Sequence, residues 1–363
     1  MISEPAIRKI IVEPDALRHD MTHRILQKLP ETPVQNSTEN ADIKMTEQDM
    51  GKETLHLLAY KGDFLKQCPG TRNYICCGYQ ILNLATNCPI ECSYCILQSY
   101  FNQPDLRLFV NVEEGLVKVL DSIDKNPEKI YRIGTGEFTD SLALDHVSSF
   151  SSLLIPEFTK RKNVILEFKT KTTQVNGLID SQYRDRIVVS WSLNSPFIST
   201  HEEHNAASIT KRLEAASRCQ EEGFILGFHF DPIVCHHNWK DGYAKTVELL
   251  DKYIDPKGII WISLGGFRFM PELKGIIRRR HQKSCVLNGE FIVGLDGKMR
   301  YFKPIRLELF SFMQEKLNKW HPDMGIYLCM ESDDVWKMSL GWSPKDSEGL
   351  SRFLDNRVEM IFG

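Results

Sequence analysis

The chain has no long hydrophobic run. None of its 363 residues lie in a stretch approaching the roughly 18 consecutive apolar residues that a membrane-spanning helix needs. Residues 1–9 also lack the apolar core of a secretory signal peptide. These two absences predict a cytoplasmic protein without a membrane partner.

The chain also lacks an internal repeat, and it lacks the export signal that usually accompanies disulfide-bonded proteins. Hydrophobic residues make up 42% of the sequence, which is enough to bury a large core. Its ten cysteines come without an export signal, so we expect reduced thiols that bind metal or pack in the core. The composition predicts one large α/β domain with appendages.

Little net charge remains over the whole chain, but it is unevenly distributed. The formal charge is −3, yet residues 268–306 contain ten lysines or arginines against three acids. This segment therefore carries about +7 and the remainder about −10. A polyanion should meet the C-terminal third, although Arg278, Arg279 and Arg280 alone fit a solvated helix face equally well.

From residue 80 onward, short β-branched runs alternate with amphipathic stretches such as 112–123 and 211–222, which is the pattern of βα units. Six such strands predict a parallel sheet curved into a partial barrel, with an eight-stranded barrel as the alternative. The expected strands are 81–85, 130–134, 164–169, 187–193, 224–231 and 259–264.

The two ends of the chain differ from this pattern. Polar residues 31–54 predict a linker or mobile arm, preceded by a strand and a short helix within 8–30. Asp296-Gly297 predicts a two-residue turn between hairpin strands 290–294 and 298–302. We expect three regions, listed in chain order: an N-terminal extension and linker (1–75), the barrel (76–270), and a basic helix, hairpin and closing segment (271–363).

Three cysteines lie close together directly after the first expected strand of the barrel. Cys88, Cys92 and Cys95 are separated by three and two residues in a loop that contains Pro89 and Ser93. Thiolates are the usual ligands of iron-sulfur clusters, and three of them on one cluster leave a fourth iron open. Structural zinc is the alternative, but it commonly uses a second Cys-x-x-Cys pair, which the sequence lacks.

Polar residues finish the other expected strands. In parallel α/β sheets, ligands gather at the carboxyl ends of the strands, so these residues should line one site. Together they offer a carboxylate, a cation and hydrogen-bonding groups beside the cysteine loop, which suits a zwitterionic amino-acid cofactor. The four segments are Gly134–Glu137, Lys169–Lys171, Ser192–Asn194 and His229–Asp231.

Taken in order, these segments resemble the spore photoproduct lyase family of radical S-adenosylmethionine (SAM) enzymes over roughly residues 64–330. The resemblance implies a partial (β/α)6 TIM-like barrel and an enzyme that reverses a thymine dimer lesion in ultraviolet-damaged DNA with a 5′-deoxyadenosyl radical. The matching segments are Cys88–Gln98, Thr139-Asp140 with Leu142, Thr170-Lys171, Ser192–Asn194, Lys211–Ala216 and Gly227–Val234.

Functional roles follow from the resemblance, position by position. It implies that the three loop cysteines bind a 4Fe-4S cluster and that SAM is the second cofactor. It also implies that DNA is the partner and that a reductant such as flavodoxin or ferredoxin supplies electrons. The implied SAM-binding residues are Gly136, Glu137, Lys171, Ser192 and Asn194, and the implied DNA-binding residues of the hairpin are Lys298, Arg300 and Tyr301.

The chain departs from the family in its radical relay. Members of the family have a hydrogen-donating cysteine after the second strand, where this chain has Gly136–Thr139, and a tyrosine where this chain has Ile96. Tyr94 is retained. Cys76 or Cys77 is a candidate substitute donor. Two alternatives stay open: both are buried core residues, or they join Cys68 and Cys329 around a second metal.

These observations predict a radical SAM lyase acting on DNA lesions. Two alternatives remain open. The first keeps the radical chemistry but acts on RNA, a peptide or a small molecule, and the second is a metal-stabilised nucleic-acid-binding protein without enzyme activity.

Overall fold

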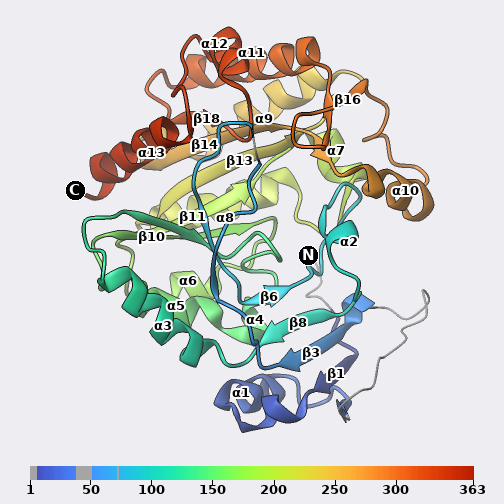
Figure 1. Cartoon of the computed structure of the whole chain (residues 1–363), viewed down its shortest axis with the longest axis vertical. Helices are drawn as coiled ribbons and strands as arrows, with labels where there is room; N and C mark the ends of the chain where they lie inside the picture. The colour runs from blue at the N-terminus through green and yellow to red at the C-terminus, as the bar shows by residue number, and fades with distance from the viewer. Residues whose placement is uncertain (1–5, 38–50, 72) are drawn as a thin grey trace.

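The computed structural model describes residues 6–37, 51–71 and 73–363. Its centre is an open, curved sheet in which seven strands run parallel, with β4 (Leu65–Gln67) added antiparallel at one edge (Figure 1). The seven parallel strands, in spatial order, are β18 (Ile326–Leu328), β14 (Ile259–Gly266), β13 (Ile225–Ile233), β11 (Ile187–Ser192), β10 (Val164–Thr170), β9 (Tyr131–Gly134) and β5 (Gln80–Leu82).

The six strands expected from the sequence are therefore confirmed within a few residues, and the sheet forms a half-barrel rather than a closed barrel. β11 and β14 are buried along their whole length. Parallel strands covered on both faces read as continuous β-branched runs, which is why the sequence pattern located them well. The sequence analysis missed β18, because only three residues form it.

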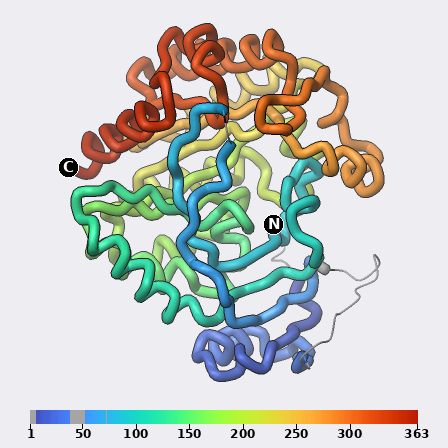
Figure 2. Tube along the Cα trace, in the orientation of Figure 1, coloured from blue at the N-terminus to red at the C-terminus, as the bar shows by residue number. Residues whose placement is uncertain are grey.

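Helices connect the parallel strands and cover the outside of the half-barrel (Figures 1 and 2). They are α4 (Asp145–Ser148) and α5 (Phe150–Phe158), α6 (Asn176–Ile179), α7 (Pro196–His201) and α8 (Ile209–Glu221), α9 (Trp239–Tyr253), and α11 (Lys303–Trp320). Beyond β18, α12 (Asp333–Leu340) and α13 (Ser347–Phe362) end the chain. No helix among the described residues is both long and apolar enough to cross a membrane.

A second sheet extends the molecule at its N-terminal side. Four strands run parallel in the order β2, β1, β3, β8, and β6 pairs antiparallel with β8. Helix α1 (Asp20–Lys28) lies below this sheet and α3 (Val112–Asp124) follows β8 (Figure 1). The strands are β1 (Lys9–Val12), β2 (Val34–Asn36), β3 (Thr54–Leu58), β6 (Ala85–Thr86) and β8 (Leu106–Phe109).

The expected linker over 31–54 is partly replaced by structure. β2 lies within it, and the short 3-10 helix Gly51–Glu53 leads directly into β3. The rest of the expected arm, 38–50, lies outside the described residues. The expected boundary at residue 75 stays a prediction. However, β4 from the extension pairs with β5 from the barrel, and β3 pairs with β8, so both sheets cross that boundary.

The expected hairpin is present, but its turn differs. β16 (Phe291–Val293) and β17 (Met299–Tyr301) pair antiparallel, and β15 (Arg268–Phe269) joins β17 on the other side. Gly294 N–H donates to the Lys298 carbonyl at 2.8 Å, so the loop holds three residues. Gly297 has a φ of +77°, the left-handed conformation that closes such a three-residue loop. The expected two-residue turn is therefore wrong.

Candidate active site

The cysteine loop is fixed by backbone contacts on both sides. Its short strand β7 (Glu91–Cys92) pairs antiparallel with β12 (Glu203–His204), with Cys92 opposite Glu203. The Cys95 N–H donates to the Cys92 carbonyl at 3.1 Å. The Gln98 side-chain amide then donates to the carbonyls of Cys92 and Ser93, each at 3.0 Å. These bonds hold the loop in a compact turn.

A buried carboxylate ties the cysteine loop to a distant part of the chain. Glu202 accepts a hydrogen bond from the Ser93 hydroxyl, and it also accepts from the Ser284 hydroxyl and the Cys285 N–H, each at 2.7 Å. From the other side, the Lys52 ammonium donates to the Ile90 carbonyl at 2.6 Å. Residues nearly 200 positions apart thus position one loop.

The three loop cysteines fit an iron-sulfur cluster. All are free thiols, and Cys95 lies close enough to raise the pKa of both Cys88 and Cys92. Burial raises the pKa of Cys88 to about 12, and burial also raises the pKa of Cys92, an effect that nearby Lys171 opposes. Among the described residues, no three His, Cys, Asp or Glu side chains surround a single point where one metal ion would sit. Three thiolates are the type of ligand that an iron-sulfur cluster takes.

Tyr94 and Lys171 meet beside the cysteine loop around a shared acid. The buried Tyr94 hydroxyl donates to Glu203, and the Lys171 ammonium lies 3.9 Å from the same carboxylate and 5.9 Å from the tyrosine ring centre. Arg212, which is fully buried, donates to the other oxygen of Glu203. Although burial alone would raise the pKa of Glu203, Arg212 and Lys171 lower it. Sequence reasoning missed Glu203 and Arg212, since neither follows a strand.

Glu137, which is predicted to bind SAM, pairs with Lys169, a residue to which the resemblance gives no role. Its carboxylate lies 3.3 Å from the Lys169 ammonium, so Lys169 and Lys171 project to separate places. Gly136 leaves room for this loop to pack. A Cβ there would meet the Lys169 Cβ and carbonyl oxygen and the Ser141 hydroxyl at 3.0 Å each. The roles of Gly136, Glu137 and Lys171 in SAM binding stay predictions.

Ser192 ends β11, Asn194 follows two residues later, and both are buried. The Asn194 amide donates to the Pro232 carbonyl at 3.0 Å, while its oxygen accepts from the Tyr243 hydroxyl at 2.6 Å and from the Ser195 N–H at 3.1 Å. The Ser192 carbonyl accepts from Arg212 at 2.8 Å. Asn194 therefore already holds neighbouring backbone in place, and its predicted contact with SAM would compete with these bonds.

An ion pair that the sequence did not predict joins β13 and β15. The two terminal N–H groups of Arg268 donate to the two carboxylate oxygens of Asp231 in β13, each at 3.0 Å. One of them also lies 3.3 Å from the Cys329 sulfur. Asp231 was noted as a strand-end residue, but its partner comes from β15 and the thiol from the residue after β18. Only the fold brings these residues together, so no local pattern points to them.

The remaining candidate cysteines are Cys68, Cys76, Cys77 and Cys329. The Cys76 thiol contacts the Thr71 carbonyl at 3.7 Å, and its N–H donates to Ser347. Burial raises the pKa of Cys68, Cys77 and Cys329. Glu137 further raises the pKa of both Cys68 and Cys77, and Cys76 also raises that of Cys77. Cys68 and Cys77 therefore lie near a predicted SAM-binding residue, and the hydrogen-donor role of Cys76 or Cys77 stays a prediction.

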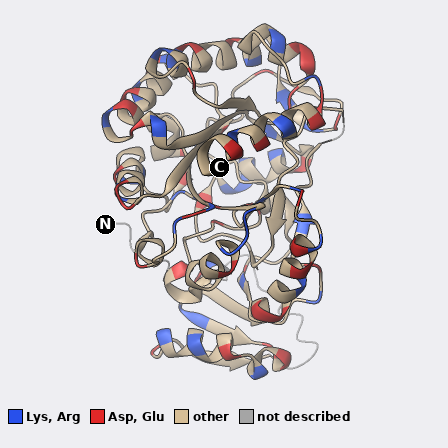
Figure 3. Ribbon diagram, turned by 90° about the vertical axis from the view of Figure 1, so that its left-hand side faces the viewer, with Lys and Arg blue, Asp and Glu red and all other residues tan. Residues whose placement is uncertain are grey.

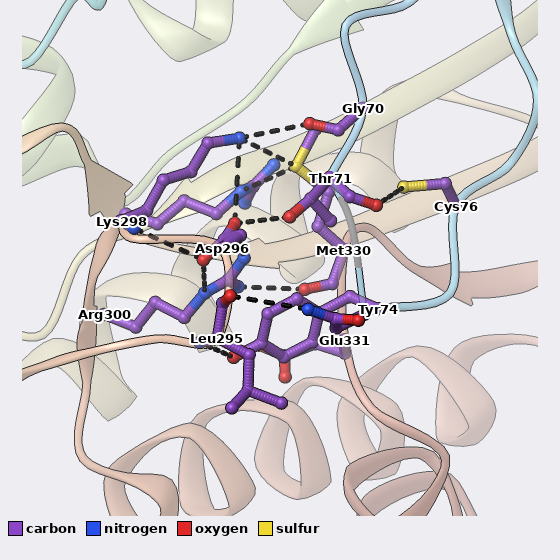
Figure 4. Close-up of polar contacts among 12 residues, drawn as sticks. Gly70, Thr71, Tyr74, Cys76, Leu295, Asp296, Lys298, Arg300, Met330 and Glu331 are labelled. Atoms are coloured by element: carbon purple, nitrogen blue, oxygen red, sulfur yellow. Dashed lines mark hydrogen bonds and ion pairs between the residues drawn. The ribbon is translucent and has the colours of Figure 1, made fainter.

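The hairpin does not present its basic side chains to solvent (Figure 4). Arg300 is 2% exposed, donates to Asp296 at 2.6 Å and to the Met330 carbonyl at 2.9 Å, and lies 4.0 Å from the Tyr74 ring centre. Lys298 donates to the Gly70 carbonyl at 3.2 Å. Tyr301 is fully buried and accepts a hydrogen bond from the Cys235 N–H at 3.0 Å.

In this conformation, Lys298, Arg300 and Tyr301 hold the hairpin against the rest of the protein. Their predicted contact with DNA would need the hairpin to separate from residues 70–74. The side chains that the hairpin exposes to solvent are instead apolar. Val293 is 66% and Leu295 is 73% exposed, and Ile292 is also exposed.

Comparison with known proteins places the chain in a family. The family model described as spore photoproduct lyase matches residues 6–292. Spore photoproduct lyase of Bacillus subtilis (strain 168) is 28% identical over 239 residues, which cover 64% of this chain and 67% of that protein. Spore photoproduct lyase of Clostridium acetobutylicum is 26% identical over 264 residues, covering 70% of this chain and 76% of that protein.

Solved structures support the same fold. A spore photoproduct lyase complexed with a dinucleoside spore photoproduct has a TM-score of 0.78 at 21% identity and covers 89% of this chain and 99% of its own. A mutant with bound AdoMet and the same dinucleoside has a TM-score of 0.78 at 22% identity and covers 90% and 98%. The chain therefore belongs to the spore photoproduct lyase family of radical SAM lyases.

Proposed function

We propose that this protein is a radical SAM lyase that repairs thymine dimer lesions in ultraviolet-damaged DNA. The observation that carries the proposal is the three-thiol loop, held rigidly beside Lys171 and Tyr94 at the carboxyl ends of the barrel strands. Free thiols suit the reducing cytoplasm that the sequence predicts.

Cys88, Cys92 and Cys95 would hold a 4Fe-4S cluster whose fourth iron is open to SAM. When bound, that cluster supplies the electron that cleaves SAM into methionine and a 5′-deoxyadenosyl radical. The protein's own task is to fix the loop, which Gln98 and Glu202 do through the hydrogen bonds to Cys92 and Ser93.

Two charged residues that follow the barrel strands suit the two ends of an amino acid. Glu137 is an acid for the SAM ammonium, and Lys171 is a cation for its carboxylate. Lys171 already faces Glu203, and Glu137 already faces Lys169, so both side chains are oriented before a ligand arrives. Preorganised charges need less rearrangement on binding, which favours affinity.

The exposed side chains of the hairpin suit the separation of stacked bases better than they suit binding to phosphates. A lesion within a duplex must leave the base stack to reach a buried site. Proteins that unstack bases often insert apolar side chains between them, and the hairpin exposes Ile292, Val293 and Leu295. We assign these three residues to the contact with the damaged site.

The test is lesion reversal by anaerobically reconstituted protein with SAM and dithionite. Restored thymine should form from irradiated DNA, with 5′-deoxyadenosine rising only when the lesion is present. Undamaged DNA and protein without SAM serve as controls. Cleavage of SAM without thymine restoration would reject the DNA lesion as substrate, and absence of both products from a protein with bound cluster would reject the lyase itself.

One observation favours a second candidate. The basic hairpin residues that should meet DNA are buried and bonded within the protein. A radical SAM enzyme acting on another substrate, such as RNA, a peptide or a small molecule, would not need them free. The same assay separates the two, because only the DNA enzyme responds to irradiation of the DNA.

A further inference from the structure

Five exposed cations lie on helix α10 (Pro271–Arg280) and in the turn after it. Within the part of the chain that the structure describes, none of the five takes part in an ion pair or a side-chain hydrogen bond, and Glu272 is the single acid among them. Unpaired cations gathered on one helix create a local positive potential that attracts an anionic partner. The five are Lys274, Arg278, Arg279, Arg280 and Lys283.

This basic surface is joined directly to the cysteine loop. α10 packs against α2 (Leu97–Tyr100), the short helix that follows Cys95 (Figure 1). The His281 ring nitrogen lies 3.1 Å from the Gln98 side-chain oxygen, and the Gln98 amide donates to the Cys92 carbonyl. A path of two hydrogen bonds therefore runs from the end of α10 to a predicted cluster ligand.

Exposed apolar groups lie at the two ends of α2, the helix that packs against α10. Ile96, next to Cys95, is 40% exposed, and Tyr100 is 55% exposed with its ring stacked on Phe138 at 5.8 Å. Small transient interfaces for redox partners combine a limited apolar contact with surrounding charges that guide the encounter. The arrangement here has both parts.

We propose that α10, with Ile96 and Tyr100, is the docking surface for an acidic one-electron carrier protein of the flavodoxin or ferredoxin class. The proposal rests on the proposed function, because reductive cleavage of SAM needs an electron from outside. In the docked complex the carrier is oxidised by one electron and the lyase is reduced by one, and no covalent bond forms or breaks.

The surface suits a carrier better than DNA for two reasons. Phosphate backbones are held by cations and polar groups, and they gain nothing from exposed Ile96 and Tyr100. The cations also lie on a helix that packs against α2, directly after the cysteine loop, and His281 at the end of that helix connects to the Cys92 carbonyl through Gln98. An electron needs a short route to the loop, whereas a DNA lesion must enter among the strand-end residues.

The opposite side of the molecule provides a matched control. The helices on that side carry positive and negative side chains mixed together (Figure 3). Lys118, Lys125 and Lys162 are exposed there, and no ion pair involves them among the described residues. Reversing these three charges gives the same change in net charge far from α10.

The experiment compares the wild type, R278E/R279E/R280E and K118E/K125E/K162E as reconstituted holoenzymes. Production of 5′-deoxyadenosine is driven either by dithionite or by a reduced flavodoxin at low ionic strength. Binding of the same flavodoxin is measured by titration. The α10 variant should keep the dithionite rate within about twofold and lose at least about tenfold in both flavodoxin-driven rate and affinity, since steering depends on charge. The loss should shrink at about 0.5 M salt, where screening is strong.

The control variant should match the wild type in every arm. Equal flavodoxin-driven rates and affinities in all three proteins would overturn the proposal, as would an equal loss with dithionite. A kept flavodoxin rate with weakened binding of irradiated DNA would assign the surface to nucleic acid instead. R278Q/R279Q/R280Q, which carries no new charge, repeats the test if the reversal variant folds poorly. If the wild type with dithionite makes no 5′-deoxyadenosine, the proposed function fails first, and that result is distinct from all of these.

Discussion

Two neighbouring basic segments of this chain, the hairpin and helix α10, use their cations in opposite ways. The hairpin cations Lys298 and Arg300 bond to Asp296 and to carbonyls of residues 70 and 330, so they hold the hairpin in place. The cations of α10 are exposed and unpaired among the described residues. The comparison teaches that a count of charges locates a basic segment but does not tell which charges are available to a partner.

The largest expected effect is the loss of stability when Asp296, the acid that pairs with the hairpin cations, is removed. Asp296→Ala leaves Arg300 buried without its partner, and removal of one member of a buried pair typically costs about 3–5 kcal/mol of stability. Chemical denaturation measures this cost. The exposed acid of α10 is the control, because Glu272→Ala should change stability by less than about 0.5 kcal/mol. Equal effects of the two substitutions would remove the distinction between the segments.

Acid should weaken the hairpin as well. Burial by itself raises the pKa of Asp296, but hydrogen bonds from Arg300 and Thr71 and the charge of Lys298 lower it to about 2. Because this folded-state pKa lies below the unfolded value of 3.8, the stabilisation is present above about pH 4 and is lost as pH falls toward 2. The loss should be about 2 kcal/mol. Asp296→Asn should flatten this part of the stability profile, and an unchanged slope would contradict the assignment.

The exposed hairpin residues should matter for DNA rather than for folding. Val293→Ser with Leu295→Ser should lower affinity for irradiated duplex DNA about fivefold, roughly 1 kcal/mol, because the apolar side chains that enter the stack are lost. Fluorescence anisotropy with lesion-bearing and undamaged duplexes measures the change. Val117→Ser on α3, another exposed apolar side chain, is the control. Unchanged affinity in the hairpin variant would leave the hairpin without a role at the lesion.

The smallest expected effect concerns the stability of α10. R278E/R279E/R280E removes no buried contact, so its free energy of unfolding should stay within about 1 kcal/mol of the wild type. The same denaturation experiment applies. A loss as large as that of Asp296→Ala would show that the α10 cations support the fold, and the contrast between the two segments would disappear.

Sequence reasoning located the half-barrel and the cysteine loop well because both are encoded locally. Buried parallel strands such as β11 and β14 are continuous apolar runs, and the cysteines lie within eight residues. It predicted a strand and a short helix within 8–30, which are β1 and α1, but it missed the sheet around them, since β3 pairs with β8 about 50 residues away and no local pattern records that pairing. It also did not predict that Glu137 pairs with Lys169, because the two residues follow different strands that only the fold brings together.

Other site features could not be predicted because they depend on burial. Asn194 follows a strand, as a ligand-binding residue would, yet its amide oxygen accepts from Tyr243 and its amide nitrogen donates to the Pro232 carbonyl. Asp231, Arg268 and Cys329 come from β13, β15 and the residue after β18, which are distant in sequence. Each residue has an ordinary sequence context, and only the folded sheet places them side by side.

The most direct test of the central claim is production of 5′-deoxyadenosine from SAM by reconstituted protein with dithionite, comparing Cys92→Ala with Cys235→Ala. Both remove one free thiol, but only Cys92 lies in the loop proposed to hold the cluster. The account predicts that Cys92→Ala loses its iron and its 5′-deoxyadenosine while Cys235→Ala keeps both. Turnover retained in Cys92→Ala, with iron still bound, would contradict it.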